Sequence, residues 1–297
     1  MTTKFHDLTG NLYENVPMAK HTSWRAGGIA RRVYQPENVK DLAVFLSQLA
    51  ADEPLLWVGF GSNLLVRDGG FPGTVILTAG TLQKLEINQQ RVEVEVGVSC
   101  GKLARQCAKS GLNGTAFLAG IPGNFGGALA MNAGAHRSET WPLLSEVTTI
   151  DRSGSIHQRP VTDFQVSYRH VISPADEWFV AATMDLELGD STVELEEIKA
   201  LLKLRNTSQP ANQPCAGSVF RNPEGDFSGR LIEVSDLKGL TIGGASVSEK
   251  HANFIVNTGN ATAQNIEDLI NLVQQKVKKL QGVELIQEVH IIGEAKS

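Results

Sequence analysis

Short apolar runs separated by polar turns predict a mixed chain of strands and helices. The uninterrupted apolar run at 55–58 is typical of a buried strand, whereas apolar and charged residues alternate over 92–96, as in a strand with one wet face. Apolar residues recur at helical spacing over 39–49, directly after Pro36, which favours the start of a helix. A further helix is expected over 103–108, with Gly111 as its cap.

The second half of the chain continues this alternation. Further elements are expected, in chain order, at 147–151 (strand), 178–188 (strand), 194–205 (helix), 254–256 (strand) and 285–292 (strand). The strongest amphipathic pattern runs from Ile266 to Leu280, with Thr262 as its expected N-cap and Gly282 as its end. The break in the pattern at 189–192 indicates that a last domain begins near residue 190.

The composition narrows the class of protein. The chain has 297 residues, 41% of them hydrophobic, which is enough for the cores of two or three domains. Its net charge of −5, without a basic block, argues against nucleic-acid binding, and no apolar stretch reaches the roughly 20 residues of a membrane helix. The first ten residues lack the apolar centre of a signal peptide. Three cysteines without a C-x-x-C spacing and seven histidines without a tight cluster indicate reduced thiols, no metal site and a cytoplasmic protein.

The most glycine-rich stretch, GIPGNFGGALAMNAGA at 120–135, is the first candidate for ligand binding. Glycine permits positive φ and close backbone approach, and a loop rich in N–H groups is a natural cradle for phosphates. Asn124 and Asn132 can supply polar contacts, and no charged side chain intrudes. The competing interpretation is a sharp turn packed against another backbone, but so many glycines in one stretch favour a bound ligand.

A second glycine loop, GFGSN at 59–63, follows the predicted strand at 55–58, as in many nucleotide sites. Neither loop matches the dinucleotide fingerprint, because Gly61 is followed by Ser-Asn-Leu. The segment GVSCGK at 97–102 is one residue short of a P-loop and lacks its Ser or Thr, so neither a simple Rossmann domain nor a P-loop NTPase is expected. The basic segment HTSWRAGGIARR at 21–32 is either a solvated strand edge or an anion-facing wall beside the glycine loops.

Two polar residues are candidates for chemistry with ordinary structural alternatives. Ser218 lies in a polar segment, 215–223, without a Gly-x-Ser-x-Gly frame, so it is a turn hydroxyl or a proton donor rather than a nucleophile at an elbow. Arg169 follows Tyr168 in a strand-like run, and it is either a surface residue or a fixed cation for a carboxylate.

A third candidate is Glu288, in the strand expected at 285–292. There, period two places Glu288, His290 and Ile292 on one face. Most carboxylates in such strands face solvent, and this remains the ordinary alternative for Glu288.

In order and combination, these segments resemble the UDP-N-acetylenolpyruvoylglucosamine reductase family of flavoenzymes. The matching segments are HTSWRAGGIA, GFGSNLLVRDGGFPGTVI, GIPGNFGGALAMNAGA, SYRH, AGSVFRNP, SEKHANFIVN and GVELIQEVHIIG, and they span residues 21–293. The chain departs from the family at 136–139, where relatives more often have a glycine, and at Arg221, where they often carry lysine. The last domain has no long insertion, as in the compact subtype that lacks a substrate-covering tyrosine loop.

The resemblance implies an α+β fold in three parts. These are FAD-binding subdomains at 1–80 and 81–190, of the vanillyl-alcohol-oxidase type, and a C-terminal substrate-binding domain at 191–297. FAD would be held by Gly59, Gly61, Ser62, Asn63, Leu64, Gly120, Ile121, Pro122, Gly123, Gly126, Gly127, Asn132 and Gly134. The substrate would be bound by Tyr168, Arg221, Asn222, His251 and Asn253.

The resemblance also implies an activity: the NADPH-dependent reduction of UDP-N-acetylglucosamine enolpyruvate to UDP-N-acetylmuramate, a peptidoglycan precursor. NADPH would give hydride to flavin N5, and the flavin would pass it to the vinyl carbon C3. Arg169 and Glu288 would stabilise the enolate-like charge, with Glu288 protonated or hydrogen-bonded, and Ser218 would protonate C2. The alternatives are another FAD-dependent oxidoreductase of this fold and a nucleotide-binding protein without catalysis. A monomer without a nucleic-acid or membrane partner is expected.

Overall fold

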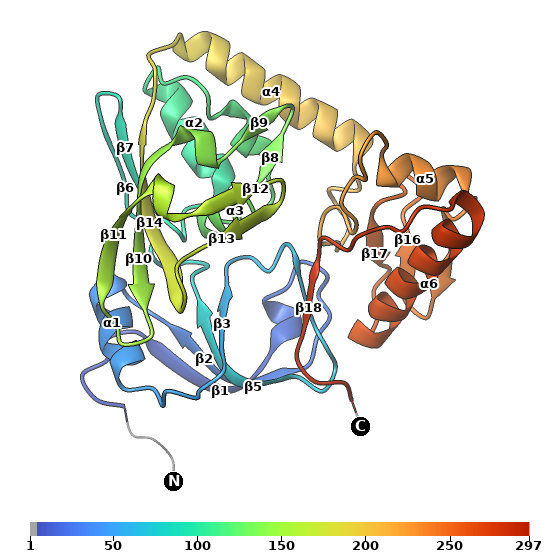
Figure 1. Ribbon diagram of the computed structural model, residues 1–297, viewed down its shortest axis with the longest axis horizontal. Helices are drawn as coiled ribbons and strands as arrows, with labels where there is room; N and C mark the ends of the chain where they lie inside the picture. The colour runs from blue at the N-terminus through green and yellow to red at the C-terminus, as the bar shows by residue number, and fades with distance from the viewer. Residues whose placement is uncertain (1–4, 297) are drawn as a thin grey trace. The chain divides into compact units, whose positions relative to one another are not determined.

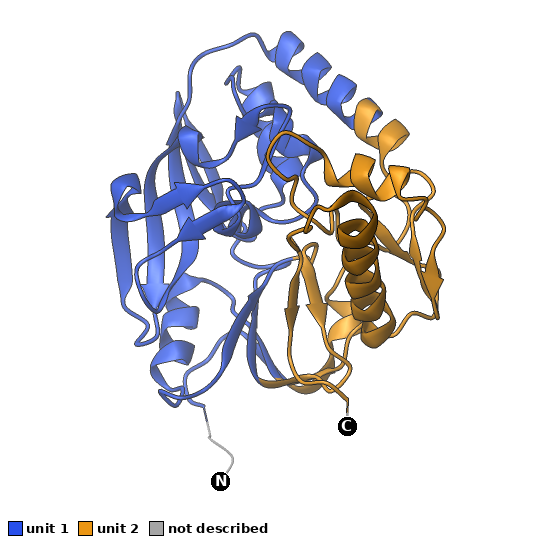
Figure 2. Cartoon of the chain, turned by 45° about the vertical axis from the view of Figure 1, so that its right-hand side comes forward, with its two compact units in different colours: residues 1–13, 32–59, 73–203 blue, residues 14–31, 60–72, 204–297 orange. Residues whose placement is uncertain are grey.

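The computed structural model describes residues 5–296 (Figure 1), and these fall into two units (Figure 2). The described parts of unit 1 are 5–13, 32–59 and 73–203, and those of unit 2 are 14–31, 60–72 and 204–296. Each unit is therefore assembled from segments that are distant in the sequence. The three-part division expected from the sequence remains a prediction.

The main sheet of unit 1 has the strand order β11-β10-β14-β7-β6, with every neighbouring pair antiparallel. Its strands are β6 Leu85–Asn88, β7 Arg91–Glu95, β10 Leu144–Asp151, β11 Ile156–Pro160 and β14 Glu177–Asp185. Buried Val92 and Val94 alternate with exposed residues in β7, which confirms a strand with one wet face. β14 ends before the expected residue 188, because the Glu187 carbonyl leaves the sheet and accepts the N–H of Asn113.

Three helices of unit 1 contribute buried side chains to one apolar core that they share with this sheet. They are α1 Val39–Ser47, α2 Cys100–Lys109 and the short α3 Phe125–Ala130, of which the first two confirm the predicted helices. α2 is followed by Gly111 in the left-handed conformation (φ +66°), as its predicted capping role requires. Cys100 and Cys107 belong to the core, where burial raises the pKa of their thiols to about 12 and about 11. Both thiols are therefore packing groups that stay protonated at neutral pH.

Shorter elements follow, and the residues of several of them are divided between unit 1 and unit 2. A four-stranded sheet has the order β1-β2-β5-β3, with β3 and β5 parallel. Its strands are β1 Asn11–Pro17, β2 Ile29–Gln35, β3 Leu55–Val58 and β5 Phe71–Leu77. Two hairpins are formed by β8 Gly134–Ala135 with β9 Ser138–Glu139 and by β12 Gln165–Ser167 with β13 His170–Ile172. The strand expected at 55–58 and the helix expected at 194–205, observed as α4 Ser191–Ser208, are confirmed.

Unit 2 is organised around α6 Ala263–Gln281 (Figure 1). Thr262 caps α6 and forms a capping box with Asn265, and Gly282 ends it at φ +71°, so both predicted boundaries are confirmed. The apolar face of α6 ends at Val277, because Leu280 is exposed. The other elements are α5 Ser228–Val234, the antiparallel sheet of β15 Thr241–Ile242, β16 Ala245–Val247 and β17 Ile255–Asn257, and the parallel pair of β4 Leu64–Val66 with β18 His290–Ile292.

Among residues 5–296, no helix combines the length and the apolar character needed to cross a membrane.

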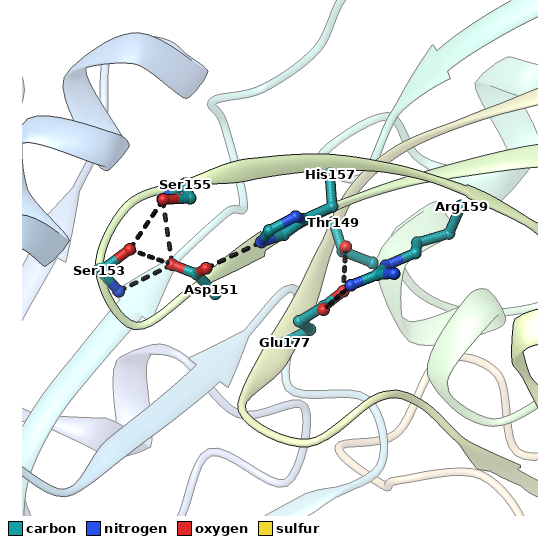
Figure 3. A network of polar contacts seen from close by, with 7 residues as sticks. All are labelled: Thr149, Asp151, Ser153, Ser155, His157, Arg159 and Glu177. Carbon is teal, nitrogen blue, oxygen red and sulfur yellow. Dashed lines mark hydrogen bonds and ion pairs between the residues drawn. The ribbon is translucent and has the colours of Figure 1, made fainter.

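A polar network fixes the turn between β10 and β11 (Figure 3). The Asp151 carboxylate accepts the Ser153 N–H at 2.8 Å, the Ser155 N–H at 3.0 Å and a contact from the His157 ring at 2.8 Å. Partial burial alone would raise the pKa of Asp151, but these hydrogen bonds outweigh burial and lower the pKa to about 2.

Asp151→Asn is expected to lower the free energy of unfolding by about 1–2 kcal/mol at pH 7, after allowance for solvent screening. Because the folded-state pKa lies below the unfolded one, this stabilisation is present above about pH 4 and disappears as the pH falls to about 2. Urea unfolding of both proteins at several pH values measures the difference. The wild type should lose its advantage within that window, and a pH-independent difference would contradict the assignment.

Candidate functional site

The glycine-rich stretch of unit 1 is not a continuous loop, because α3 Phe125–Ala130 lies inside it. The prediction of a continuous loop is therefore wrong at these six residues. The first two N–H groups of α3 donate to the carbonyl oxygens of Val98 and Val96, at 2.8 and 2.9 Å. The N–H groups of Gly123 and Asn124 donate to no described residue. These two amides, rather than the helix N-terminus, are the donors that the stretch offers to a ligand.

Two glycines of this stretch are not explained by packing within unit 1. A Cβ atom at Gly120 or Gly127 would meet no atom within 4 Å, and neither residue has a positive φ. A Cβ atom at Gly126, by contrast, would lie 2.8 Å from the Cβ atom of Val96. Open space beside two glycines, close to two unbonded amides, is what the approach of a pyrophosphate requires. The stretch therefore fits the FAD pyrophosphate.

The first glycine loop is divided: Gly59 belongs to unit 1 and residues 60–64 to unit 2. In unit 2, Gly61 has φ +59°, and a Cβ atom there would lie 2.2 Å from the carbonyl oxygen of His21. Ser23 holds the loop, because both its N–H and its hydroxyl donate to the Gly61 carbonyl, at 3.1 and 3.2 Å. The segment 21–32 thus does lie beside a glycine loop, and its contact with an anion remains a prediction.

Arg169 occupies the two-residue turn of the β12–β13 hairpin in unit 1. Its φ of +55° is unusual for a residue with a side chain. Its Nη2 donates to the Gly134 carbonyl at 2.8 Å, and its guanidinium carbon lies 5.5 Å from the ring centre of Tyr168. The arginine is therefore held to the backbone of the glycine-rich stretch rather than extending into solvent.

Asn132 and the β8–β9 hairpin form the C-terminal end of the glycine-rich stretch. The Asn132 amide donates to Glu139 at 2.9 Å and accepts the Trp141 N–H at 3.2 Å, so its side chain is engaged within unit 1. His136 and Arg137 form the turn between β8 and β9 with φ values of +54° and +71°. Glycine and asparagine are the usual residues of such turns, so His136 and Arg137 hold a conformation that glycine adopts more readily.

In unit 2, a loop anchored on both sides presents Ser218. Val219 N donates to the Asn253 carbonyl at 2.9 Å, and the Asn253 side chain bonds both backbone groups of Phe220, at 3.0 and 2.8 Å. The Ser218 hydroxyl itself has no hydrogen-bond partner among residues 5–296. A hydroxyl that served the turn would be bonded within it, so this geometry favours a group kept for a ligand.

Glu288 lies in an irregular segment, and the strand expected from residue 285 is wrong before His290. Its N–H donates to the Val219 carbonyl at 2.8 Å, and its carbonyl accepts the Asn63 side chain at 3.2 Å. The chain thus leaves the Ser218 loop and joins β4 only at His290, so no continuous face carries residues 288, 290 and 292. This crossing brings Asn63 of the first glycine loop, the Ser218 loop and Glu288 together in unit 2.

The remaining predicted substrate residues of unit 2 surround the same loop. The Arg221 guanidinium has no carboxylate partner within the described chain. The pKa of His290 is lowered first by the burial of its ring and second by the positive charge of Arg221. Asn222 accepts the Ser228 N–H at 3.1 Å. Burial and then the charge of Lys238 lower the pKa of His251, whose Nδ1 accepts the Asn253 N–H at 3.2 Å. His251 is therefore neutral at pH 7, with its proton on Nε2.

The predicted site residues are thus divided between the two units. Unit 1 holds Gly59, the glycine-rich stretch, Tyr168 and Arg169, and unit 2 holds residues 61–64, Ser218, Glu288 and the other substrate candidates. Sequence reasoning missed Ser23, which fixes Gly61, and it gave Asn124 no specific role. The only local signal at Asn124 is that asparagine is a usual N-cap residue, and this would have indicated a capping bond that its side chain does not make.

Comparison with known proteins places the chain in a class. Residues 30–158 match the family described as FAD binding domain, and residues 209–292 match the C-terminal domain of UDP-N-acetylenolpyruvoylglucosamine reductase. The fold and the glycine loops thus define an FAD-binding flavoprotein of α+β class with a C-terminal substrate domain, as expected.

Relatives that match nearly the whole chain identify its family. UDP-N-acetylenolpyruvoylglucosamine reductase of Alkalilimnicola ehrlichii is 56% identical over 288 residues, 97% of both chains. That of Legionella pneumophila strain Lens is 56% identical over 96% of this chain and 94% of its own. The crystal structure of the reductase from Thermus caldophilus superposes with a TM-score of 0.83 at 30% identity, covering 97% of this chain and 100% of that one. The chain belongs to the UDP-N-acetylenolpyruvoylglucosamine reductase family.

Proposed function

We propose that this chain reduces UDP-N-acetylglucosamine enolpyruvate to UDP-N-acetylmuramate with NADPH as the hydride donor. The observation that carries the proposal is the 56% identity with a reductase of that name over 97% of both chains. Bound FAD supplies the redox chemistry, by taking a hydride from NADPH and delivering it to the substrate. The Gly120 and Gly127 backbone and the Gly123 and Asn124 amides would hold its pyrophosphate.

Arg169 and Glu288 are proposed to stabilise the negative charge that develops on the substrate. When hydride reaches the vinyl carbon C3, electron density moves through C2 toward the carboxylate. A guanidinium offers a planar fork that matches a carboxylate, and Arg169 is already oriented by Gly134. Glu288, in its protonated form, would donate a hydrogen bond to the same charge.

Ser218 is proposed to complete the reduction by giving a proton to C2. Its unbonded hydroxyl and its fixed backbone leave the group ready to act without prior rearrangement. Hydride at C3 and the proton at C2 together saturate the enolpyruvyl double bond, and the serine regains a proton from solvent. The chain is proposed to act as a monomer in the cytoplasm, where peptidoglycan precursors are made.

The purified protein is expected to be yellow, with FAD that is released on denaturation. It should oxidise NADPH rapidly only when the enolpyruvyl substrate is present, and absorbance at the NADPH band measures this. Flavin that stays attached to the denatured chain would favour another oxidoreductase of this fold. Tight FAD binding without substrate-dependent NADPH oxidation would instead indicate a non-catalytic nucleotide-binding protein.

A further inference from the structure

We infer that Asn124 is a positioning residue for FAD: its side chain is bonded to Gly97 and lies against Gly59, so it sets the distance, within unit 1, between the glycine-rich stretch and the residue at which the first glycine loop begins. The inference rests on the proposed FAD site, and it concerns a residue that contacts the loops rather than the substrate.

Asn124 stands at the N-cap of α3 but does not act as a cap. An asparagine in this position ordinarily accepts an N–H bond from the first turn, as Asn38 accepts the Asp41 N–H at the start of α1. The Asn124 side chain makes no such bond. Its Nδ2 instead donates to the carbonyl oxygen of Gly97 at 2.6 Å, and the residue is only 3% exposed. The side chain therefore serves contacts beyond its own helix.

The other end of the amide lies against Gly59. Oδ1 of Asn124 is buried and has no hydrogen-bond partner among the described residues. A Cβ atom at Gly59 would lie 2.6 Å from this oxygen, 3.2 Å from Cγ and 3.3 Å from Cβ of Asn124. Asn124 thus restricts position 59 to glycine. A buried acceptor without a donor is destabilising and is kept in few native structures without a reason.

A functional reason follows from the backbone of the same residue. The N–H of Asn124 is one of the two amides that the glycine-rich stretch leaves unbonded, and Gly123 supplies the other. The side chain therefore fixes the orientation of the amide that would face the pyrophosphate and, through Gly59, the start of the first loop. Pre-organised donors of this kind bind without the cost of ordering them.

The test is a double-mutant cycle with the FAD dissociation constant as its readout. Asn124→Ala removes the side-chain amide that lies against Gly59, and Gly59→Ala adds a methyl group that clashes with this amide. Each change alone should therefore weaken FAD binding by about 10- to 100-fold. In the double variant the new methyl group occupies the space that the amide has left, at 3.3 Å from the remaining Cβ atom. The double variant should therefore bind FAD no worse than Asn124→Ala, and the two effects should not multiply.

Two controls separate positioning from general stability. Asn38→Ala removes an ordinary helix cap, and Gly154→Ala places a methyl group 2.3 Å from the Ala43 carbonyl, away from both loops. Both should lower the melting temperature of the apoprotein and leave the FAD dissociation constant unchanged. If Asn124→Ala gives too little folded protein, Asn124→Ser, which keeps a polar atom near Cγ, should show an intermediate loss of affinity.

The outcomes are distinct. Wild-type affinity in Asn124→Ala, or multiplicative losses in the cycle, would overturn the positioning role while leaving the proposed function intact. A wild-type protein that binds no FAD would overturn the proposed function and this inference together. A change in the flavin absorption spectrum of Asn124→Ala, at full saturation with FAD, would further support a role in orientation.

Discussion

Ser218→Ala should slow the reduction of the enolpyruvyl substrate by about 10²–10⁴-fold and leave the NADPH half-reaction near the wild-type rate. The substitution removes a hydroxyl that has no partner among residues 5–296, while the bonds of Asn253 to Phe220 keep the loop in place. Stopped-flow traces of flavin absorbance, recorded separately for NADPH and for the enolpyruvyl substrate, measure the two half-reactions. Ser218→Cys should recover part of the rate, because a thiol also carries a transferable proton.

Ser235→Ala is the matched control for Ser218→Ala, because Ser235 is also a serine of unit 2 and is not a site candidate. The Ser235 hydroxyl is buried and donates to the Leu231 carbonyl at 2.7 Å, so its loss should lower stability and affect both half-reactions to a similar, small extent. If Ser218→Ala behaves like this control, with equal slowing of both half-reactions or of neither, Ser218 is a turn residue and not the proton donor.

Elements set by local pattern were predictable from the sequence. α6 carries its own periodicity, its capping box and its left-handed glycine within some twenty residues, so no distant part of the chain is needed to specify it. The same holds for α2 with Gly111 and for the alternation in β7. Where these signals act within one segment, the sequence predicts both the element and its ends.

Elements set by distant partners were not predictable in the same way. The segment before His290 has the composition of a strand, but its backbone is divided between the Ser218 loop and Asn63, which lies 225 residues from Glu288. α3 forms within a glycine-rich stretch of low helix propensity, and its first N–H groups bond to Val96 and Val98. In both cases tertiary hydrogen bonds override the local pattern, and these are the regions that carry the candidate site.

The identity of the site residues was more predictable than their environment. The resemblance assigned Ser218, Glu288 and Arg169 by motif, since the motif letters alone are enough for that step. It did not indicate that the Ser218 hydroxyl has no partner, that Asn253 anchors the loop, or that Asn124 faces Gly59. Such facts depend on which backbone atoms meet in space, and a single sequence does not encode them in any local pattern.

Arg169→Lys should slow substrate reduction by about 10–10³-fold, with FAD binding and the NADPH half-reaction preserved. The guanidinium has five N–H donors in one plane, so it can donate to the Gly134 carbonyl and still present a fork to a carboxylate. A lysine ammonium is a single point charge on a flexible stem and cannot hold both partners in that geometry.

Two further variants make the Arg169 prediction specific. Arg169→Gly fits the left-handed turn at φ +55° and removes the cation, so it should fold well and lose more activity than the lysine variant. Arg159→Lys is the matched control, because Arg159 is paired with Glu177 in the network of Figure 3 and should affect stability but neither half-reaction. Stopped-flow rates over a range of substrate concentrations separate weaker binding from slower reduction. Unchanged substrate reduction in both Arg169 variants would show that this arginine only shapes the hairpin, whereas a loss confined to the substrate half-reaction assigns it to the developing carboxylate charge.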